Sequence, residues 1–116
     1  MAAGKYNMTI EQGTTVSIDF QYQTSAGVPI VLTNYTARMQ ARPTVSSAVT
    51  VMDCTTANGQ LVITAETGTV TLALTATQSA ALDFGTAVYD LEIISSTGVV
   101  TRLVEGTVTL SREVTR

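Results

Sequence analysis

Strict alternation of apolar and polar side chains over Thr15–Gln23 is the sequence feature that most constrains the fold. Polar residues separate the apolar ones, which are Val16, Ile18, Phe20 and Tyr22. Successive side chains of a β-strand point to opposite faces, so a period of two indicates a strand with one buried and one solvated face. The segment therefore predicts a sheet that packs against a second layer.

Several further short segments repeat this pattern, with glycine- and proline-containing turns between them. Pro29 cannot donate to a ladder, so Val28–Leu32 is expected to be an edge or an irregular crossing. Seven to nine short strands separated by such turns are typical of an immunoglobulin-like antiparallel β-sandwich, the all-β fold that we expect. The remaining expected strands are Tyr6–Ile10, Tyr35–Arg42, Val49–Asp53, Leu61–Ala65, Thr69–Thr75 and the two strands of a hairpin over Thr86–Leu110.

The hairpin over Thr86–Leu110 is expected to lie at the centre of one sheet, because two apolar runs flank the turn Ser95-Ser96-Thr97-Gly98. Its first strand is expected to bury Ala87, Tyr89, Leu91 and Ile93. Tyr89 follows the corner Asp83-Phe84-Gly85, an arrangement similar to the tyrosine corner of immunoglobulin-like sandwiches. Tyr89, Asp83 and Gly85 are therefore predicted to form a structural corner.

The second strand of the hairpin has two possible phases. A β-bulge at Glu105-Gly106 would place Leu103, Val108 and Leu110 on one face. Without a bulge, Val100, Val104 and Val108 face inward and Arg102 extends its guanidinium to solvent. We favour the bulge.

One stretch, Thr75–Leu82, has helical character, and it predicts a short helical turn near residues 76–82. Either Thr75 or Thr77 is a suitable N-cap. A piece this short is marginal as an isolated helix, so we expect a single turn that joins two strands across the sandwich.

Length and composition indicate one domain over residues 1–116, with flexible ends at 1–5 and 111–116. Charged residues make up 13% of the chain and the net charge is −3, which argues against nucleic-acid binding. No apolar run approaches the length of a membrane span, so no membrane partner is expected. The single cysteine, Cys54, excludes an intrachain disulfide and is expected to be a buried structural residue.

Residue types leave little room for catalysis, and we expect neither an enzyme nor a cofactor or metal site. The chain has no histidine, which excludes Ser-His-Asp triads, Cys-His nucleophile systems and histidine-containing zinc sites. Asp90 and Glu92 share one strand face near Arg102. We interpret these three residues as a solvated face with cross-strand charge pairs.

Arg38 and Arg42 project from the same face of one expected strand. They either make that face soluble or bind an acidic partner surface, because arginine is enriched in protein interfaces.

Four pieces in order along the chain resemble a known family. They are YNMTIEQGTTVSIDFQY, GVPIVLTNYTARMQAR, ETGTVTLALTATQSAAL and AVYDLEIISSTGVVTRLVEGTVTLSREVTR. They are similar to the immunoglobulin-like domain at the N-terminus of tailed-bacteriophage baseplate upper proteins, and to stand-alone versions encoded among tail and fibre genes. The likeness runs from Tyr6 to Arg116. The C-terminal extension of the multi-domain proteins is missing, which puts direct receptor binding in doubt.

The resemblance implies a non-enzymatic virion protein, made in the bacterial host cytoplasm and repeated by symmetry. It would act as an adaptor that docks on tail, baseplate or fibre proteins. Its ends, Met1–Lys5 and Ser111–Arg116, are candidate arms for adding a strand to a neighbour. The full set of candidate interface residues is Lys5, Tyr6, Arg38, Arg42, Arg112 and Arg116.

Two other functions remain open at this point. A capsid decoration protein would bind the outside of the head in hundreds of copies, whereas a tail adaptor would have six to a few dozen, both rough figures from closed symmetry. A carbohydrate-binding module is the second alternative, and the absence of tryptophan weakens it.

Overall fold

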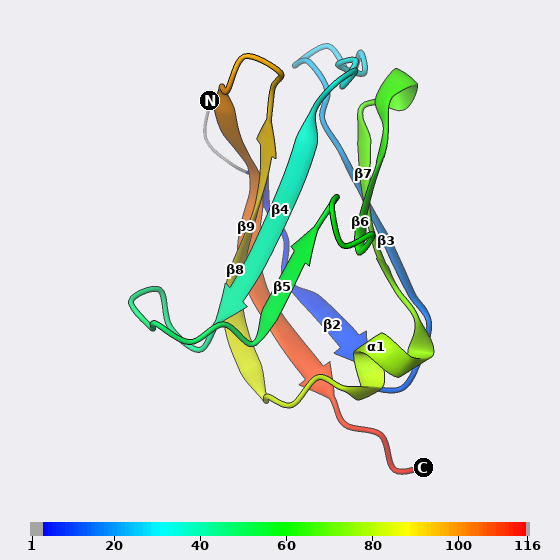
Figure 1. Ribbon diagram of the computed structural model, residues 1–116, viewed down its shortest axis with the longest axis vertical. Helices are drawn as coiled ribbons and strands as arrows, with labels where there is room; N and C mark the ends of the chain where they lie inside the picture. The colour runs from blue at the N-terminus through cyan, green and yellow to red at the C-terminus, as the bar shows by residue number, and fades with distance from the viewer. Residues whose placement is uncertain (1–3, 116) are drawn as a thin grey trace.

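The computed structural model describes residues 4–115 and is an immunoglobulin-like β-sandwich of two sheets (Figure 1). One short helix, α1 (Ala76–Ala80), and one 3₁₀ turn, η1 (Ala65–Thr67), lie between strands. Within the described range no helix has the length and apolarity needed to cross a membrane. The strands are β1 (Gly4–Lys5), β2 (Met8–Glu11), β3 (Val16–Gln21), β4 (Thr36–Arg42), β5 (Met52–Thr55), β6 (Leu61–Thr64), β7 (Thr69–Leu74), β8 (Thr86–Ile94) and β9 (Val100–Ser111).

The larger sheet has the order β1-β9-β8-β4-β5, and β2 also pairs with β9. The smaller sheet has the order β3-β7-β6. The pairs between these strands are antiparallel, except that β1 and β2 run parallel to β9. These neighbours are those of the G-F-C-C′ and B-E-D sheets of immunoglobulin folds. The predicted fold class is therefore confirmed, and the hairpin of β8 and β9 lies inside the larger sheet.

The core lies between the sheets and is filled by alternate residues of each strand, as the period of two predicts. Tyr89 and the three other residues expected to face inward from β8 are all at most 4% exposed. Fully burying a side chain such as that of Leu91 or Ile93 stabilises the fold by about 1.5–3 kcal/mol. Residues whose side chains are fully buried include Met39, Val70, Leu72, Leu91, Ile93 and Val108.

The predicted position of the β-bulge is wrong. Leu91 pairs with Val104 and Glu92 pairs with Arg102, so the extra residue of β9 is Leu103. Gly106 stays in register opposite Tyr89. A Cβ atom at position 106 would overlap the carbonyl oxygen of Tyr6, so close approach of this backbone explains the glycine without a bulge.

The expected first strand, Tyr6–Ile10, is broken into β1 and β2 by Tyr6 and Asn7. The amide of Tyr6 still donates to the carbonyl of Glu105 at 3.0 Å. The side chain of Asn7 takes the place of a backbone acceptor for β9, because its Oδ1 accepts a hydrogen bond from the amide of Thr107 at 3.1 Å. The chain therefore keeps its attachment to β9 across the break.

Tyr89 makes a different contact from that of a tyrosine corner. In a corner the hydroxyl bonds to backbone a few residues upstream. Here the Tyr89 hydroxyl donates to the carbonyl oxygen of Tyr6, 83 residues away in sequence. The residue fastens the N-terminal segment to the sandwich. Gly85 contributes through its carbonyl, which accepts from the amide of Leu110 at 2.8 Å.

The ends expected to be flexible, 1–5 and 111–116, include residues that contact the sandwich through backbone groups. Gly4 and Lys5 form β1, and Ser111 is the last residue of β9. The backbone amide of Glu113 donates to the Gln12 side chain at 2.9 Å. Residues 1–3 and Arg116 lie outside the described residues, so the expectation stays untested there.

The connection from β4 to β5 projects from the side of the sandwich as a loop (Figure 1). The strand expected at Val49–Asp53 begins only at Met52, so residues 43–51 belong to this loop. Arg42 supports the loop from its base, since its Nη1 donates to the carbonyl of Ser47 at 2.9 Å. Val45 is 86% exposed on the loop.

The predicted helical turn is confirmed as α1, and the structure shows which of the two candidate residues is its N-cap. Thr75 is the N-cap: its hydroxyl accepts from the amide of Gln78 at 3.1 Å. The Gln78 side chain accepts from the amide of Thr75 at 2.9 Å, which completes a capping box. Thr77 lies inside the helix.

Candidate functional site

On the outer surface of the larger sheet, six charged side chains are joined by ion pairs. They come from the first strand and from three strands far along the chain. Because successive residues of a strand point to opposite faces, the residues that lie between the buried ones in β4, β8 and β9 point to solvent here. We call this surface the charged face, and its residues are Lys5, Arg38, Asp90, Glu92, Arg102 and Glu105.

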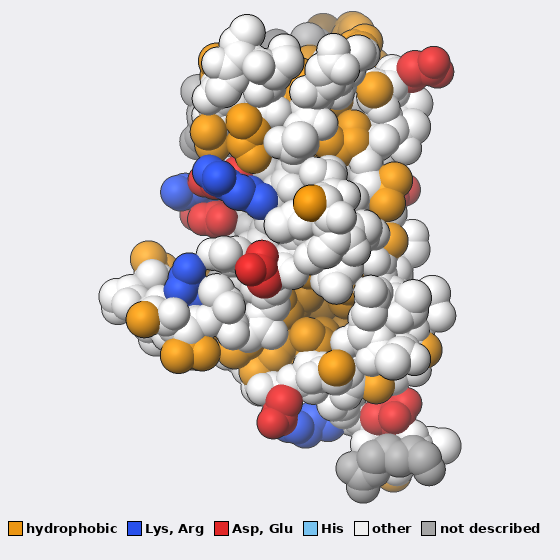
Figure 2. Space-filling model, viewed as in Figure 1, with side chains coloured by type: hydrophobic (Ala, Val, Ile, Leu, Met, Phe, Trp, Pro, Cys, Tyr) orange, Lys and Arg blue, Asp and Glu red, His pale blue; other side chains and the backbone are white. Residues whose placement is uncertain are grey.

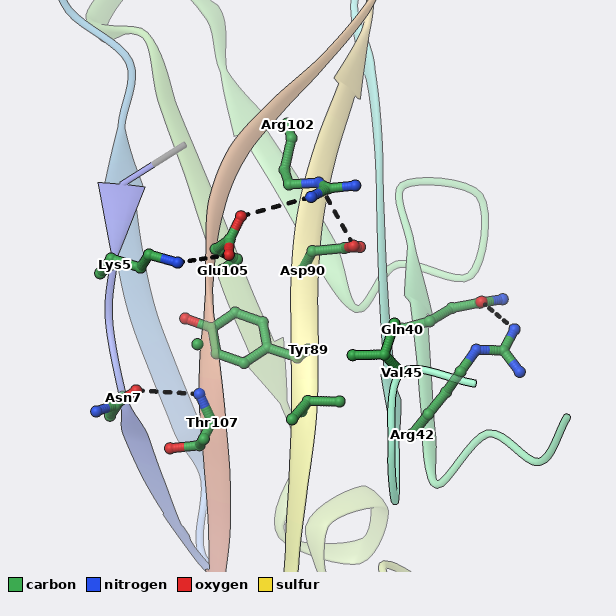
Figure 3. Close-up of a pocket in the computed structure, with 12 residues that line it drawn as sticks. Lys5, Asn7, Gln40, Arg42, Val45, Tyr89, Asp90, Arg102, Glu105 and Thr107 are labelled. Carbon is green, nitrogen blue, oxygen red and sulfur yellow. Dashed lines mark hydrogen bonds and ion pairs between the residues drawn. The ribbon is translucent and has the colours of Figure 1, made fainter. Parts of the chain in front are cut away.

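Cross-strand ion pairs connect the charged face. Lys5 Nζ lies 2.6 Å from Glu105 Oε2, between β1 and β9. Arg102 approaches Asp90 Oδ2 at 3.6 Å and Glu105 Oε1 at 3.5 Å, so it bridges two carboxylates (Figure 3).

Arg38 completes the charged face through Glu92, with Nε 2.8 Å from Oε1. Opposite charges on facing strand positions stabilise a sheet by about 0.2–1 kcal/mol a pair. The interpretation of Asp90, Glu92 and Arg102 as a face of charge pairs matches these contacts, although Glu92 pairs with Arg38.

A shallow hollow of about 490 Å³ lies between the charged face and the projecting loop. Lys5, Asp90 and Glu105 line one side, and Gln40, Arg42 and Val45 line the other (Figure 3). Figure 2 shows charged side chains gathered on this side of the molecule, next to the loop with its exposed hydrophobic side chains. The hollow therefore combines cations, carboxylates and an apolar side chain in one place.

Arg42 differs from the other cations of this region. Its Nη2 donates to Gln40 Oε1 at 2.9 Å, and its Nη1 donates to the loop carbonyl of Ser47. Within residues 4–115 it forms no ion pair with a carboxylate. The guanidinium is thus held in place by neutral groups, and no carboxylate of residues 4–115 neutralises its charge.

The two carboxyl groups beside Arg102 have pKa values that move in opposite directions. Burial raises the pKa of Asp90, and the negative charge of Glu92 adds to this, against the smaller opposing effect of Arg102. The hydrogen bond from Lys5 lowers the pKa of Glu105, and the positive charge of Lys5 acts in the same direction. Glu105 is therefore the more firmly ionised of the two.

The charged face offers recognition by charge and shape. No group of three or more potential metal-binding side chains occurs among residues 4–115. Tyr89 borders the hollow, but burial raises the pKa of its hydroxyl to about 12, so it stays protonated at neutral pH. The carboxylates that line the hollow are neutralised by lysine or arginine. An array of this kind is chemically able to form ion pairs with a surface of complementary charge.

The candidate interface residues predicted from sequence do not all come together. Lys5 and Arg42 line the same hollow, and Arg38 lies on the same outer face of the sheet. Tyr6 lies away from them, with its ring packed edge-on against Phe20 at 5.8 Å between centroids. Arg112 directly follows the end of β9, where it pairs with Asp83 at 2.9 Å. Arg116 lies outside the described part of the chain.

Sequence reasoning missed Gln40, Val45 and Glu105 as parts of this surface. The alternation of β4 places Gln40 beside Arg38 and Arg42, and that signal was available. No comparable signal exists for Glu105, because its contact with Lys5 depends on a parallel pairing between residues 100 positions apart. Val45 is placed by the course of the loop.

Comparison of the sequence with family models finds no match, and neither does comparison with curated proteins.

Proposed function

We propose that the protein is a non-enzymatic structural component of a tailed-phage virion, and that it docks on a neighbouring virion protein through the charged face together with Arg42 and Val45 of the adjoining hollow. Support comes from the ordered sequence pieces that resemble phage baseplate domains, together with a fold of the kind that the resemblance implies. An immunoglobulin-like sandwich presents a rigid sheet surface, which suits a part that repeats by symmetry.

The observation that carries the docking proposal is the position of Arg42. Its guanidinium is oriented by Gln40 and Ser47, lacks a carboxylate partner within the described range and borders the hollow next to exposed Val45. Arginine is among the residues enriched in interface hot spots, and exposed Val45 adds apolar surface beside it. The partner therefore presents a carboxylate to Arg42 and an apolar side chain to Val45.

The ion pairs of the charged face give the docking its specificity. Three cations alternate with three carboxylates, so a partner with complementary charges gains and a partner with the wrong order is repelled. Such contacts weaken as salt rises, because exposed charges are screened.

Two experiments test the proposal. A virion reconstruction should place the chain in the tail, baseplate or fibre region, in six to a few dozen copies by closed symmetry. Hundreds of copies on the capsid would make it a head decoration protein, and absence from the particle would overturn the proposal.

The docking face is tested by a matched pair of variants. Arg42→Gln should reduce incorporation into particles at least tenfold, whereas Arg112→Gln, outside the charged face and the hollow, should leave incorporation within about twofold, because charges outside the interface contribute little. Both variants are first checked for an unchanged denaturant midpoint. Equal incorporation of the two variants would contradict the docking face while leaving the virion role intact.

A further inference from the structure

The smaller sheet ends in a regular strand that has a partner on one side only. β3 pairs with β7, and within residues 4–115 no strand pairs with its other edge. The strand runs for six residues without a bulge or a proline. Natural proteins usually interrupt or cover such an edge, because its unpaired backbone groups are a template for another strand.

The register shows which backbone groups point outward. Tyr22 donates to the carbonyl of Gly68, one ladder step beyond the pair of Phe20 and Val70. Even-numbered residues of this strand therefore bond to β7, since hydrogen-bonded pairs alternate along an antiparallel ladder. The N–H and C=O groups of Ser17, Asp19 and Gln21 are directed to the open edge.

An apolar hollow of about 340 Å³ lies beside this edge, where the two sheets meet. We call it the seam, and the residues that define it are Gly4, Tyr6, Ile18, Phe20 and Leu103. A cavity of about 150 Å³ is enough to hold benzene, so the seam has room for aliphatic side chains. Gly4 adds space, because it has no side chain.

The seam extends along the edge strand. A second hollow of about 240 Å³ shares Gly4, Gln21 and Leu103 with the first. Together the two hollows follow the chain from Ile18 to Gln23, beside the exposed backbone groups. Tyr6, at 46% exposed, forms part of its wall and offers an apolar ring to an occupant.

We propose that β3 and the seam form a receptor site for an extended segment of another protein, which adds to the smaller sheet as a fourth strand. The added strand makes backbone hydrogen bonds to Ser17, Asp19 and Gln21. Every second side chain of that strand is aliphatic and enters the seam. This is the β-augmentation mode of recognition, in which main-chain bonds supply affinity and a side-chain pocket supplies specificity.

Asp19 decides what kind of strand fits. Its exposed carboxylate stands in the middle of β3, with Oδ1 accepting a hydrogen bond from Thr71 at 2.7 Å. Two copies that paired antiparallel through their outward groups, with Ser17 opposite Gln21, would place Asp19 against its own equivalent, and like charges directly opposite are destabilising. A foreign strand with lysine or arginine opposite Asp19 forms a favourable cross-strand pair instead.

This site is separate from the charged face and does not depend on a phage origin. The test uses the folded, ¹⁵N-labelled chain and a capped synthetic peptide of about six to eight residues, the usual length of a strand. The peptide alternates valine with threonine and carries one central lysine on the threonine side. Binding is followed by amide chemical shifts, and protection is followed by hydrogen exchange.

The expected result is at least tenfold slower exchange of the amides of Ser17, Asp19 and Gln21 when the peptide is present. Asp19→Pro removes one outward N–H and spares the bonds to β7, so it should weaken binding at least tenfold. Asp19→Ala keeps that N–H and should retain binding, but lose the preference for the lysine peptide over an all-threonine version. Unchanged exchange of the Phe20 amide confirms that each variant keeps the β3–β7 ladder.

Three results would overturn the proposal. The first is no shift of β3 amides at about 1 mM peptide, the weak end of specific affinities. The second is equal binding by wild type and Asp19→Pro. The third is concentration-dependent self-association of the wild type in sedimentation that Asp19→Pro abolishes, which would make a second copy the occupant.

Discussion

The hydroxyl of Tyr89 donates a hydrogen bond to the carbonyl oxygen of Tyr6 across 2.6 Å. Tyr89 belongs to the middle of the larger sheet, whereas Tyr6 lies at the break between β1 and β2. The bond therefore joins the N-terminal segment, which carries Lys5 of the charged face and Tyr6 of the seam, to the most buried part of the fold.

Replacing Tyr89 with phenylalanine should lower the free energy of unfolding by about 1 kcal/mol, because one hydrogen bond is lost with little change in packing. The denaturant midpoint measures this effect. Tyr22→Phe is the control, since the Tyr22 hydroxyl makes no side-chain hydrogen bond within the described range. Equal midpoints for the two variants would show that the bond to Tyr6 contributes nothing.

Gly106 should tolerate no side chain. A Cβ atom there would overlap the carbonyl of Tyr6, and backbone cannot move aside as a flexible side chain does. Gly106→Ala should destabilise the protein by about 2–3 kcal/mol, in the range of overpacked sites. Gly85→Ala is the matched control, because a Cβ atom at Gly85 meets nothing within 4 Å. A midpoint for Gly106→Ala close to that of Gly85→Ala would contradict the close approach of Tyr6.

The strands of the sandwich were predictable because each carries its own signal. Period-two alternation in β3, β4, β7 and β8 depends on neighbouring residues alone, and these strands appear nearly where the sequence places them. The face of β9 was harder, because its phase changes along the strand: Val104, Val108 and Leu110 are buried, whereas Val100 is 48% exposed. The bulge at Leu103 makes this change, since Thr101 pairs with Ile93 and Val104 pairs with Leu91.

The candidate site was predictable only in part, since it depends on contacts between distant segments. Arg38 and Arg42 were found because they share one strand face. The pairing of Lys5 with Glu105, and the proximity of both to Arg42, follow from the parallel pairing of β1 with β9 and from the course of the loop. The carbonyl of Tyr6 at Gly106 has no sequence signal beyond the glycine itself.

The capping box of α1 gives a prediction that separates two threonines. Thr75→Ala should cost about 1 kcal/mol of stability, because it removes the acceptor for the Gln78 amide. Thr77→Ala, two residues on, should change stability by less than about 0.5 kcal/mol, as expected for an exposed helical position. Thermal or denaturant unfolding of the two variants measures the difference. A larger effect at Thr77 would show that the helix begins elsewhere.

The pKa of Asp90 should lie above the ordinary value of its carboxyl group, and the pKa of Glu105 should lie below its own ordinary value. A ¹³C NMR pH titration measures both values. Burial raises the pKa of Asp90 in the folded protein. The free energy of unfolding should therefore fall as pH rises from the ordinary pKa to the raised one, because the unfolded chain loses this proton first. The pKa of Glu105 is lowered by Lys5, so its contribution is present above the ordinary value and is lost as pH falls through the lowered one.

Lys5→Met isolates the cause of the Glu105 effect. The variant removes the hydrogen bond that is the largest cause, so the pKa of Glu105 should rise toward its ordinary value. Asp90 should keep its raised pKa, because burial is the main cause there. An unchanged Glu105 titration in Lys5→Met would show that the 2.6 Å contact between Lys5 and Glu105 does not persist in solution.

Cys54 should be inert in the folded protein. It is 1% exposed and its thiol lies 3.2 Å from Gln60 Oε1. Burial, with a smaller contribution from the charge of Asp53, raises its pKa to about 12. At pH 8 roughly one thiol in ten thousand is then ionised, and the thiolate is the reactive form. A disulfide exchange reagent should therefore react only as fast as the core opens, and at once in denaturant. Rapid labelling of the native protein would mean that β5, which carries Cys54, leaves the sheet on a short timescale.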